Sequence, residues 1–200
     1  SGVSDAPDPL ADLAPPPGGK PLVVYTGTLE SYQGIDLLIN GFAKILDEIP
    51  CAALLIVGGN ADQVKHYTAL AEQAGLGEQC KFTGRVPQVK AKYYNSIADV
   101  IVSARTSGTN TPLKLYEQLH CGIPLVATNI YSHTQVLNND VAFLVEPTPD
   151  GMTQGIIAAV NDTQEAKDRV ANAQKLYENC YSRTAYIDKM KRMLSLLRAS

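Results

Sequence analysis

Residues 53–59 read Ala-Leu-Leu-Ile-Val-Gly-Gly, a short apolar run that ends at two glycines. A fully apolar run of this length is typical of a strand that is buried on both faces. Stretches with apolar residues at helical spacing lie on either side of it, over 35–49 and 64–74. The sequence therefore predicts a strand between two helices, the repeating unit of a parallel sheet.

The same alternation continues in both directions along the chain. Further strands are predicted at 22–25, 81–83, 99–103, 124–127 and 142–145. Further helices are predicted at 88–96, 112–120, 133–137, about 151–161, 164–179 and 184–198. The pattern predicts an α/β fold: a doubly wound, Rossmann-like parallel sheet of about six strands with helices on both faces.

The first twenty residues differ from the rest in composition. Residues 1–21 hold six of the twelve prolines, among them Pro15-Pro16-Pro17, and few large apolar residues. We expect 1–20 to be a flexible or extended linker and 21–200 to be one domain. A linker that leads straight into a strand suggests that the domain follows another part of a larger protein.

The overall composition is that of a globular chain, since 45% of the 200 residues are apolar and 18% are charged. A net charge of −3 without a basic block argues against binding to duplex nucleic acid. We expect neither a membrane span nor a signal peptide. The four cysteines lack metal-ligand spacing and are interpreted as buried free thiols of a reducing, cytoplasmic compartment.

Ligands of doubly wound sheets bind outside the carboxyl ends of the strands, so the loops that follow the strands are the candidate site. Gly27 follows the first strand and Gly58 the second. They either form ordinary turns or allow a ligand to approach the backbone. Neither the dinucleotide-binding G-x-G-x-x-G pattern nor a Walker motif is present, which disfavours those two nucleotide sites.

The loop after the fourth strand leads into a helix that we expect to begin at Thr111 as N-cap and Pro112 as first residue. Lys114 then lies in the first turn, where a cation opposes the helix dipole. A bound anion would reverse that effect, and Arg105 would add a second positive charge. The alternative is that Lys114 extends into water.

Two further side chains have two possible roles each. Glu117 either pairs with Lys114 on the same helical face or accepts hydrogen bonds from a ribose diol. His133 lies either at the mouth of the site or at a helix start, where it helps to cap the helix. The sequence holds no catalytic triad, metal cluster or carboxylate pair, which disfavours hydrolases and metalloenzymes.

Four segments, in order and at matching spacing over about 21–147, resemble the group 1 retaining glycosyltransferases. They are Tyr-Thr-Gly-Thr-Leu-Glu-Ser-Tyr-Gln-Gly-Ile-Asp-Leu-Leu-Ile at 25–39, Ala-Leu-Leu-Ile-Val-Gly-Gly at 53–59, Phe-Thr-Gly-Arg-Val-Pro at 82–87 and Thr-Asn-Thr-Pro-Leu-Lys-Leu-Tyr-Glu-Gln-Leu-His-Cys-Gly-Ile-Pro-Leu-Val-Ala-Thr at 109–128. The resemblance implies the GT-B fold, two Rossmann-like domains that face a cleft. This chain resembles the C-terminal domain, which binds the nucleotide sugar.

The resemblance implies roles for individual residues. Glu117 stands where the family binds the ribose, and Arg85 and Val86 stand where it binds the base. The sequence departs from the family at three positions: Thr28 and Gln33 replace an arginine and a lysine that hold the diphosphate, and Thr109 replaces a glutamate that holds the sugar. The predicted nucleotide-binding residues are Gly27, Thr28, Gly58, Arg85, Val86, Thr111, Leu113 and Glu117. The predicted sugar-binding residues are Thr109, Asn110, Thr111 and His133, and the predicted catalytic residues are Lys114, Arg105 and Thr109.

We therefore expect the donor-binding domain of a glycosyltransferase that transfers a sugar from a nucleotide-diphosphate sugar to an acceptor hydroxyl, without a metal or other cofactor. Its expected partners are the donor, an unknown acceptor and a missing N-terminal domain. The alternatives are a domain that binds the nucleotide sugar without catalysis and a sugar-nucleotide epimerase, for which His133 is the one candidate acid or base.

The helix predicted at 184–198 is amphipathic. Its apolar face carries Tyr186, Met190, Met193, Leu194 and Leu197. We expect this face to pack on the domain itself or on the missing half, with the charged side chains in water. Association with a membrane surface is an alternative that we do not favour.

Overall fold

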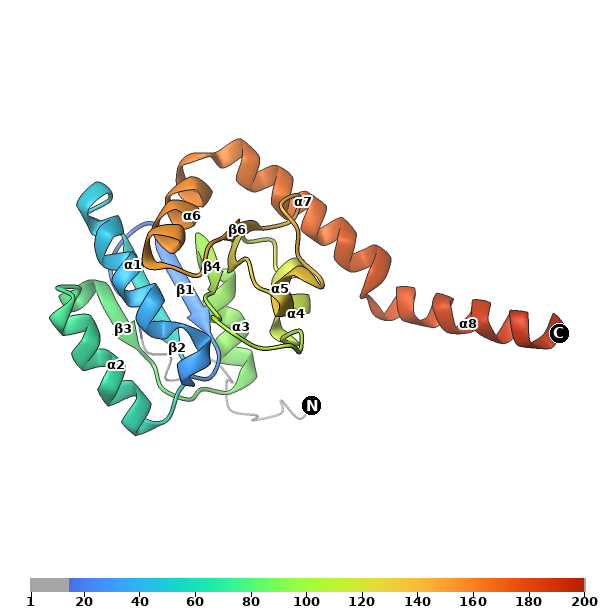
Figure 1. Ribbon diagram of the computed structural model, residues 1–200, viewed down its shortest axis with the longest axis horizontal. Coiled ribbons are helices and arrows are strands. Elements are labelled where there is room, and N and C mark those ends of the chain that lie inside the picture. Colours follow the sequence, from blue (N-terminus) through green and yellow to red (C-terminus); the bar gives the residue numbers. More distant parts are fainter. Residues whose placement is uncertain (1–14, 200) are drawn as a thin grey trace, which may run out of the picture.

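The computed structural model describes the backbone of residues 15–199 and the side chains of residues 15–192. Its centre is one parallel sheet of six strands, in the order β3-β2-β1-β4-β5-β6 (Figure 1). The strands are β1 (Leu22–Thr26), β2 (Ala53–Val57), β3 (Cys80–Phe82), β4 (Val100–Ser103), β5 (Leu125–Thr128) and β6 (Phe143–Val145). The direction of winding reverses between β1 and β4, as in a doubly wound fold, and the predicted fold class is confirmed.

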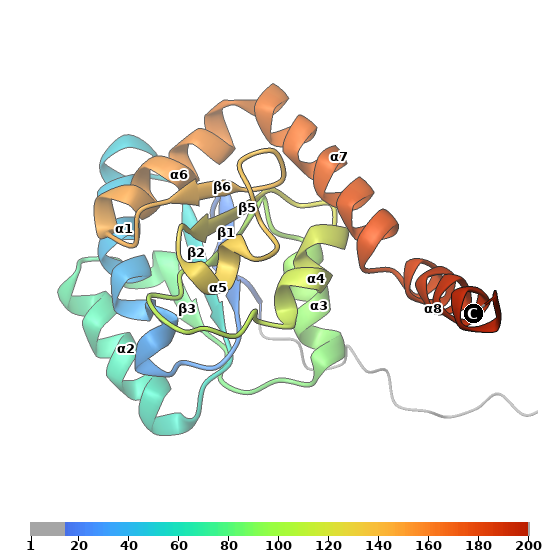
Figure 2. The same ribbon diagram turned by 45° about the vertical axis from the view of Figure 1, so that its right-hand side comes forward.

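Helices cover both faces of the sheet (Figure 2). They are α1 (Ile35–Glu48), α2 (Ala61–Gln73), α3 (Gln88–Ser96), α4 (Lys114–His120), α5 (Tyr131–Thr134), α6 (Pro149–Asn161), α7 (Thr163–Cys180) and α8 (Arg183–Ala199). Two short 3-10 helices, Ser31–Gln33 and Gly77–Gln79, lie in the connections. Helices α1, α2 and α6 belong to one apolar layer, and α3, α4 and α7 belong to the other.

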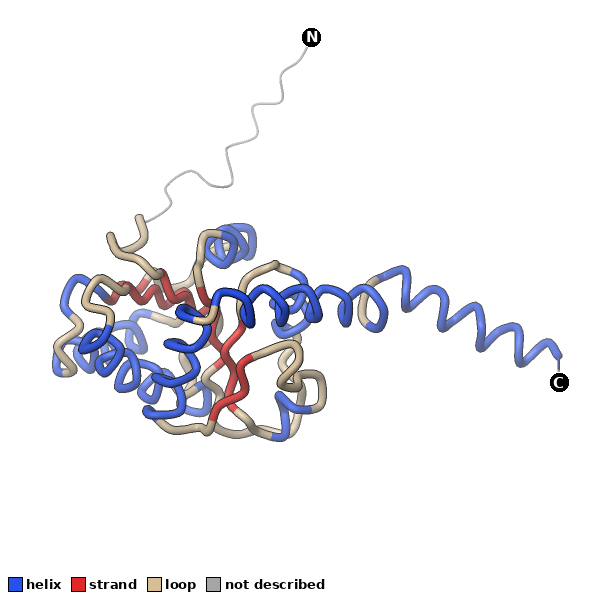
Figure 3. The backbone as a smooth tube through the Cα atoms, turned by 90° about the horizontal axis from the view of Figure 1, so that it is seen from above, coloured by secondary structure: helices blue, strands red, loops and turns tan. Residues whose placement is uncertain are grey.

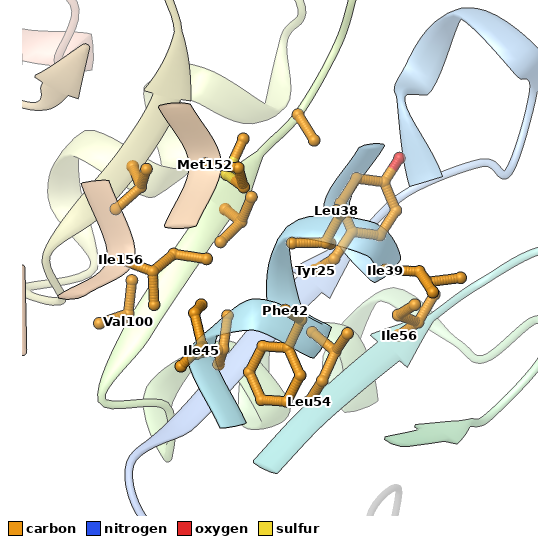
Figure 4. Packing of buried hydrophobic residues seen from close by; sticks show 14 of the residues in the cluster. Tyr25, Leu38, Ile39, Phe42, Ile45, Leu54, Ile56, Val100, Met152 and Ile156 are labelled. Atoms are coloured by element: carbon orange, nitrogen blue, oxygen red, sulfur yellow. The ribbon is translucent and has the colours of Figure 1, made fainter. Parts of the chain in front are cut away.

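The two layers follow from the alternation of side chains along β1. Val23 and Tyr25 contribute to the layer under α1 and α6, whereas Leu22 and Val24 contribute to the layer under α3 and α4. In Figure 4, Phe42 and other apolar side chains of α1 lie against the strands of the first layer. Every residue of β1 is buried, which explains why the run is continuously apolar up to Tyr25.

Helices α2 and α6 begin earlier than predicted because capping residues precede the apolar pattern. Asn60 and Gln63 form a reciprocal capping box at the start of α2. Thr148 accepts a hydrogen bond from the amide of Gly151, and Pro149 is the first residue of α6. The signals were present in the sequence, but apolar periodicity alone does not detect them.

Helix α8 extends away from the sheet and its covering helices (Figures 1 and 3). Tyr186, Ile187 and Met190 are exposed, by 64%, 39% and 36%. Of the predicted apolar face, Tyr186 and Met190 therefore do not pack on the domain itself, and packing on the missing half, the other alternative, stays a prediction. Side chains Met193, Leu194 and Leu197 lie outside the described part. No helix among the described residues combines the length and apolarity that a membrane crossing requires.

The predicted linker lies largely outside the described residues. Its described end is attached to the domain: the Lys20 amide donates to the Cys51 carbonyl at 2.9 Å, and the Lys20 ammonium pairs with Asp99 at 2.9 Å. All four cysteines are free, as predicted. Only Cys80 is buried, however, and Cys51 is exposed, so the expectation of buried thiols is wrong for most of them.

Candidate functional site

The loops that follow β1, β2 and β3 meet at the carboxyl edge of the sheet. The Gly27 amide donates to the Val57 carbonyl at 3.0 Å, and the Gly58 amide donates to the Gly84 carbonyl at 2.9 Å. A Cβ atom on Gly58 would lie 1.9 Å from the Gly27 carbonyl oxygen. The glycines therefore serve as tight structural turns, and they also bring three backbones together at this edge.

A cavity of about 340 Å³ opens between these loops. Its lining includes Gly27, Thr28, Gly58, Arg85 and Val86. These are five of the eight residues that the sequence predicted to bind a nucleotide, and they come from three separate loops. A larger cavity of about 790 Å³ lies at the amino edge beside α7, and none of the predicted site residues lines it.

The first cavity is also lined by residues that sequence reasoning missed, among them two polar side chains. Glu30 and Gln63 also line it, and the Gln63 amide donates to the Glu30 carboxylate at 3.0 Å. Gln63 carried a capping signal in the sequence, but nothing in its spacing pointed to a ligand.

Lys114 turns inward and does not extend into water. Its ammonium donates to the Thr26 carbonyl at 3.1 Å and lies 4.4 Å from the centre of the Tyr25 ring. Burial disfavours the charged form and, together with the nearby Arg105, lowers the pKa of Lys114 to about 7. This partly buried amino group at the end of β1 is available to an anionic ligand, which would favour its charged form.

The predicted start of α4 is wrong. The helix begins at Lys114 with Leu113 as N-cap, and no side chain caps it. The amides of Leu115 and Tyr116 are already bound to the carbonyls of Pro112 and Leu113, at 3.0 and 3.2 Å. Thr111 therefore has no capping role, and the helix start itself offers fewer free amides to an anion than the sequence suggested.

Arg105 holds its own loop in this structure. Its guanidinium donates to the carbonyls of Ser107 and Asn110, at 2.7 and 3.1 Å, and lies over the Tyr32 ring at 5.1 Å. This position gives Arg105 a structural task, and its predicted contact with a diphosphate stays a prediction. The loop that it holds carries the exposed side chains of Thr109 and Asn110.

The remaining predicted residues of this segment are also accessible. The Leu113 side chain is 82% exposed, and Thr111 is partly exposed. The Thr109 carbonyl accepts a hydrogen bond from Gln135 at 2.7 Å, so its backbone is fixed while its side chain faces outward.

Glu117 pairs across helices and not along its own helix. Its carboxylate accepts a hydrogen bond from Gln88 at 3.0 Å and lies 3.3 Å from the Lys92 ammonium. Among the described residues, no ion pair joins Glu117 to Lys114, so the first of its two possible roles is wrong. Gln88 and Lys92 are on α3, the helix that follows Arg85 and Val86, and sequence reasoning missed both.

His133 is fully buried, so the prediction that it lies at the mouth of the site is wrong. Its Nδ1 lies 2.8 Å from the Thr128 carbonyl, which can only accept, so Nδ1 carries the proton. Nε2 then accepts from the Ser103 hydroxyl at 3.0 Å. Burial, with smaller contributions from Lys114 and Arg105, lowers the pKa of His133 to about 4, and the neutral ring joins β4 to β5.

Thr28 and Gln33, which stand where the family has an arginine and a lysine, form a neutral pair. The side-chain amide of Gln33 donates a hydrogen bond to the Thr28 hydroxyl at 3.3 Å. No group of three or more His, Cys, Asp or Glu side chains within the described part of the chain is placed to hold a metal ion.

The sequence profile of the glycosyl transferases group 1 matches residues 13–176. This chain belongs to that family. A putative glycosyltransferase of Bacillus subtilis, YtcC, is 28% identical over 175 residues, which are 82% of this chain and 42% of the relative. A phosphatidyl-myo-inositol mannosyltransferase of Mycolicibacterium smegmatis is 28% identical over 178 residues, 86% of this chain and 44% of the relative. The chain thus spans less than half the length of these two relatives.

The fold of this group 1 glycosyl transferase domain also matches solved structures. The Anabaena protein HepE, solved in complex with UDP, superimposes with a TM-score of 0.78 at 20% identity. The match covers 88% of this chain and 49% of HepE. A half-length match to a GT-B protein agrees with the predicted C-terminal domain.

Proposed function

We propose that this chain is the donor-binding domain of a retaining glycosyltransferase that uses a nucleotide-diphosphate sugar. The observation that carries the proposal is the cavity at the carboxyl edge of the sheet, where Gly27, Thr28, Gly58, Arg85 and Val86 meet. Family membership and the UDP bound to the structurally similar HepE support this assignment.

In the proposed site, each part of the donor has its own contacts. Arg85 and Val86 bind the base, Glu117 accepts hydrogen bonds from the ribose hydroxyls, and the backbone at Gly27 approaches the diphosphate. Lys114 supplies the charge that Thr28 and Gln33 lack. The exposed side chains of the 109–111 loop face the sugar.

Sugar transfer breaks the bond between the sugar C1 and the diphosphate and forms a bond from C1 to the acceptor oxygen, while the acceptor hydroxyl gives its proton to the leaving diphosphate. Negative charge develops on the leaving diphosphate, and a cation already in place stabilises it without reorganisation. Lys114 fits this task because its amino group is fixed by Thr26 and Tyr25 before any ligand binds, and a bound diphosphate favours its charged form. The proposal assigns no metal ion to this step.

Calorimetric titration of the chain with UDP and uridine, and with GDP and guanosine, tests the donor site. Lys114→Ala should weaken binding of the diphosphate about tenfold or more, as expected for a lost charged hydrogen bond, and leave binding of the nucleoside unchanged. Glu117→Gln should weaken binding of both ligands. Lys175→Ala, an exposed lysine on α7, is the matched control. Equal diphosphate affinity in Lys114→Ala and the parent would refute the proposed site.

A domain that binds the nucleotide sugar without catalysis is the second candidate. The neutral pair of Thr28 and Gln33 and the threonine at position 109 favour it, because the family's charged contacts are absent there. Turnover by the full-length protein with a nucleotide sugar separates the two candidates. The epimerase alternative loses support, because its acid–base candidate His133 is buried.

The proposal for the whole protein includes parts outside this chain. An N-terminal GT-B domain would face the carboxyl edge and supply the acceptor site, where a compound with a free hydroxyl group would bind. The exposed apolar side chains Tyr186, Ile187 and Met190 of α8 offer a surface for that domain. We propose a cytoplasmic location, which the four free cysteines support.

A further inference from the structure

Tyr25 is a core residue whose hydroxyl group reaches the candidate site. It is the fourth residue of β1 and fully buried, and its ring packs with Leu38 and other apolar side chains of the first layer (Figure 4). Its hydroxyl donates to the Thr28 carbonyl at 2.7 Å, in the loop that lines the cavity. Burial raises the pKa of Tyr25, so the hydroxyl stays protonated as a donor.

The Tyr25 ring also lies under the Lys114 ammonium. The nitrogen is 4.4 Å from the ring centre, within the range at which the negative face of an aromatic ring attracts a cation. The Thr26 carbonyl accepts from the same nitrogen at 3.1 Å. Two consecutive residues of β1 therefore fix one cation that comes from α4.

Gly27 leaves the space that this arrangement needs. A Cβ atom at position 27 would lie 2.9 Å from the Tyr25 hydroxyl oxygen and 3.2 Å from the Lys114 nitrogen. The glycine turn, the tyrosine and the lysine are thus packed against one another, and a change in one displaces the others.

We propose that Tyr25 is the positioning residue of the donor site: its ring holds the Lys114 ammonium and its hydroxyl holds the Thr28 carbonyl, so that the cation and the glycine loop face the diphosphate together. This inference rests on the proposed function, in which Lys114 binds the diphosphate. An aliphatic side chain of similar size would fill the core but would hold neither group.

Two substitutions separate the ring from the hydroxyl. The readout is the preference of the chain for UDP over uridine, or for GDP over guanosine if the parent binds that pair more tightly. Tyr25→Leu should reduce this preference about fivefold, the size of one partly desolvated cation–π contact, whereas Tyr25→Phe should keep most of it. In a Lys114→Ala background, Tyr25→Leu should have no further effect on the preference.

A purely structural role predicts a different result. Phe42→Leu removes a buried ring from the same apolar layer away from the site, and should lower the melting temperature without changing the preference for the diphosphate. If Tyr25→Leu does not fold, Tyr25→Met makes the same comparison.

An NMR measurement tests the contact without a ligand. Protons of the Lys114 side chain above an aromatic face should show an upfield ring-current shift in the parent and in Tyr25→Phe, and lose it in Tyr25→Leu. A diphosphate preference that does not depend on Lys114 refutes the proposed function. A preference that depends on Lys114 but is unchanged in Tyr25→Leu, or a missing ring-current shift in the parent, overturns the role of Tyr25.

Discussion

The Gln88 side-chain amide donates a 3.0 Å hydrogen bond to the Glu117 carboxylate and so joins the first residue of α3 to α4. The Lys92 ammonium lies 3.3 Å from the same carboxylate oxygen. Since α3 directly follows Arg85 and Val86, these contacts couple the proposed ribose acceptor to the segment that is proposed to bind the base.

Replacing Gln88 should therefore weaken binding of the nucleoside part of the donor. Gln88→Ala leaves the Glu117 carboxylate less fixed, and we expect nucleoside and nucleoside diphosphate affinities to fall by a similar factor, about threefold. Lys92→Ala should have a smaller effect, because an exposed ion pair contributes little. Titration calorimetry with uridine and UDP checks both variants. A loss confined to the diphosphate would contradict this role of Gln88.

The contact between Gly58 and Gly27 predicts a large difference between two glycine substitutions. In Gly58→Ala the new Cβ meets the Gly27 carbonyl oxygen at 1.9 Å, so the loops must separate, and we expect a loss of about 3 kcal/mol or more in the free energy of unfolding. Gly75 also has a positive φ, of 79°, but nothing lies within 4 Å of its Cβ position.

Gly75→Ala is thus the matched control for that measurement. It should cost only the conformational penalty of a side chain at positive φ, about 1 kcal/mol. Urea denaturation of the two variants gives the comparison. Similar losses in both would show that the close approach of the two backbones does not constrain the site.

The sheet was predictable because its signals are local. Buried strands such as 53–57 are continuously apolar, and helices such as 35–48 repeat their apolar residues at helical spacing. The start of α4 was not predictable in this way. The preceding loop is fixed by the Arg105 guanidinium and by Gln135, contacts that no spacing rule contains.

The residues of the site were easier to predict from the sequence than their arrangement. The family resemblance gave Arg85, Val86 and Gly27, and the structure brings these into one cavity. The direction of Lys114 depends on Thr26, 88 residues earlier in the chain, so helix-dipole arguments alone could not find it. His133 was misplaced because a polar side chain after a strand is read as a ligand contact, whereas here it joins two strands.

The buried His133 predicts that the domain loses stability in weak acid. Its pKa is about 4 in the folded chain and is expected near 6.5 when unfolded, so the unfolded state binds more protons between these values. The free energy of unfolding should therefore fall as the pH is lowered from 6.5 to 4. His133→Asn should remove this part of the pH dependence and cost about 1–3 kcal/mol at pH 7 through lost hydrogen bonds.

Urea denaturation at several pH values measures this effect. His66→Asn, at an exposed position on α2, is the control and should keep the pH dependence of the parent. An unchanged pH dependence in His133→Asn would show that the imidazole is not held neutral in the folded domain.

The last prediction concerns proton uptake when the diphosphate binds. Burial lowers the pKa of Lys114 to about 7, and a bound diphosphate would raise it again, because an opposite charge favours the ammonium form. At pH 8 much of the free side chain is neutral, so binding of UDP or GDP should take up between about half a proton and one proton per site, and affinity should fall as the pH rises above 7. Titration calorimetry in buffers with different ionisation enthalpies measures this number directly. Nucleosides should take up none, and Lys114→Arg should bind the diphosphate without uptake because arginine stays charged. Uptake of the same size in Lys114→Ala would mean that another group titrates on binding and that Lys114 is not the cation of the site.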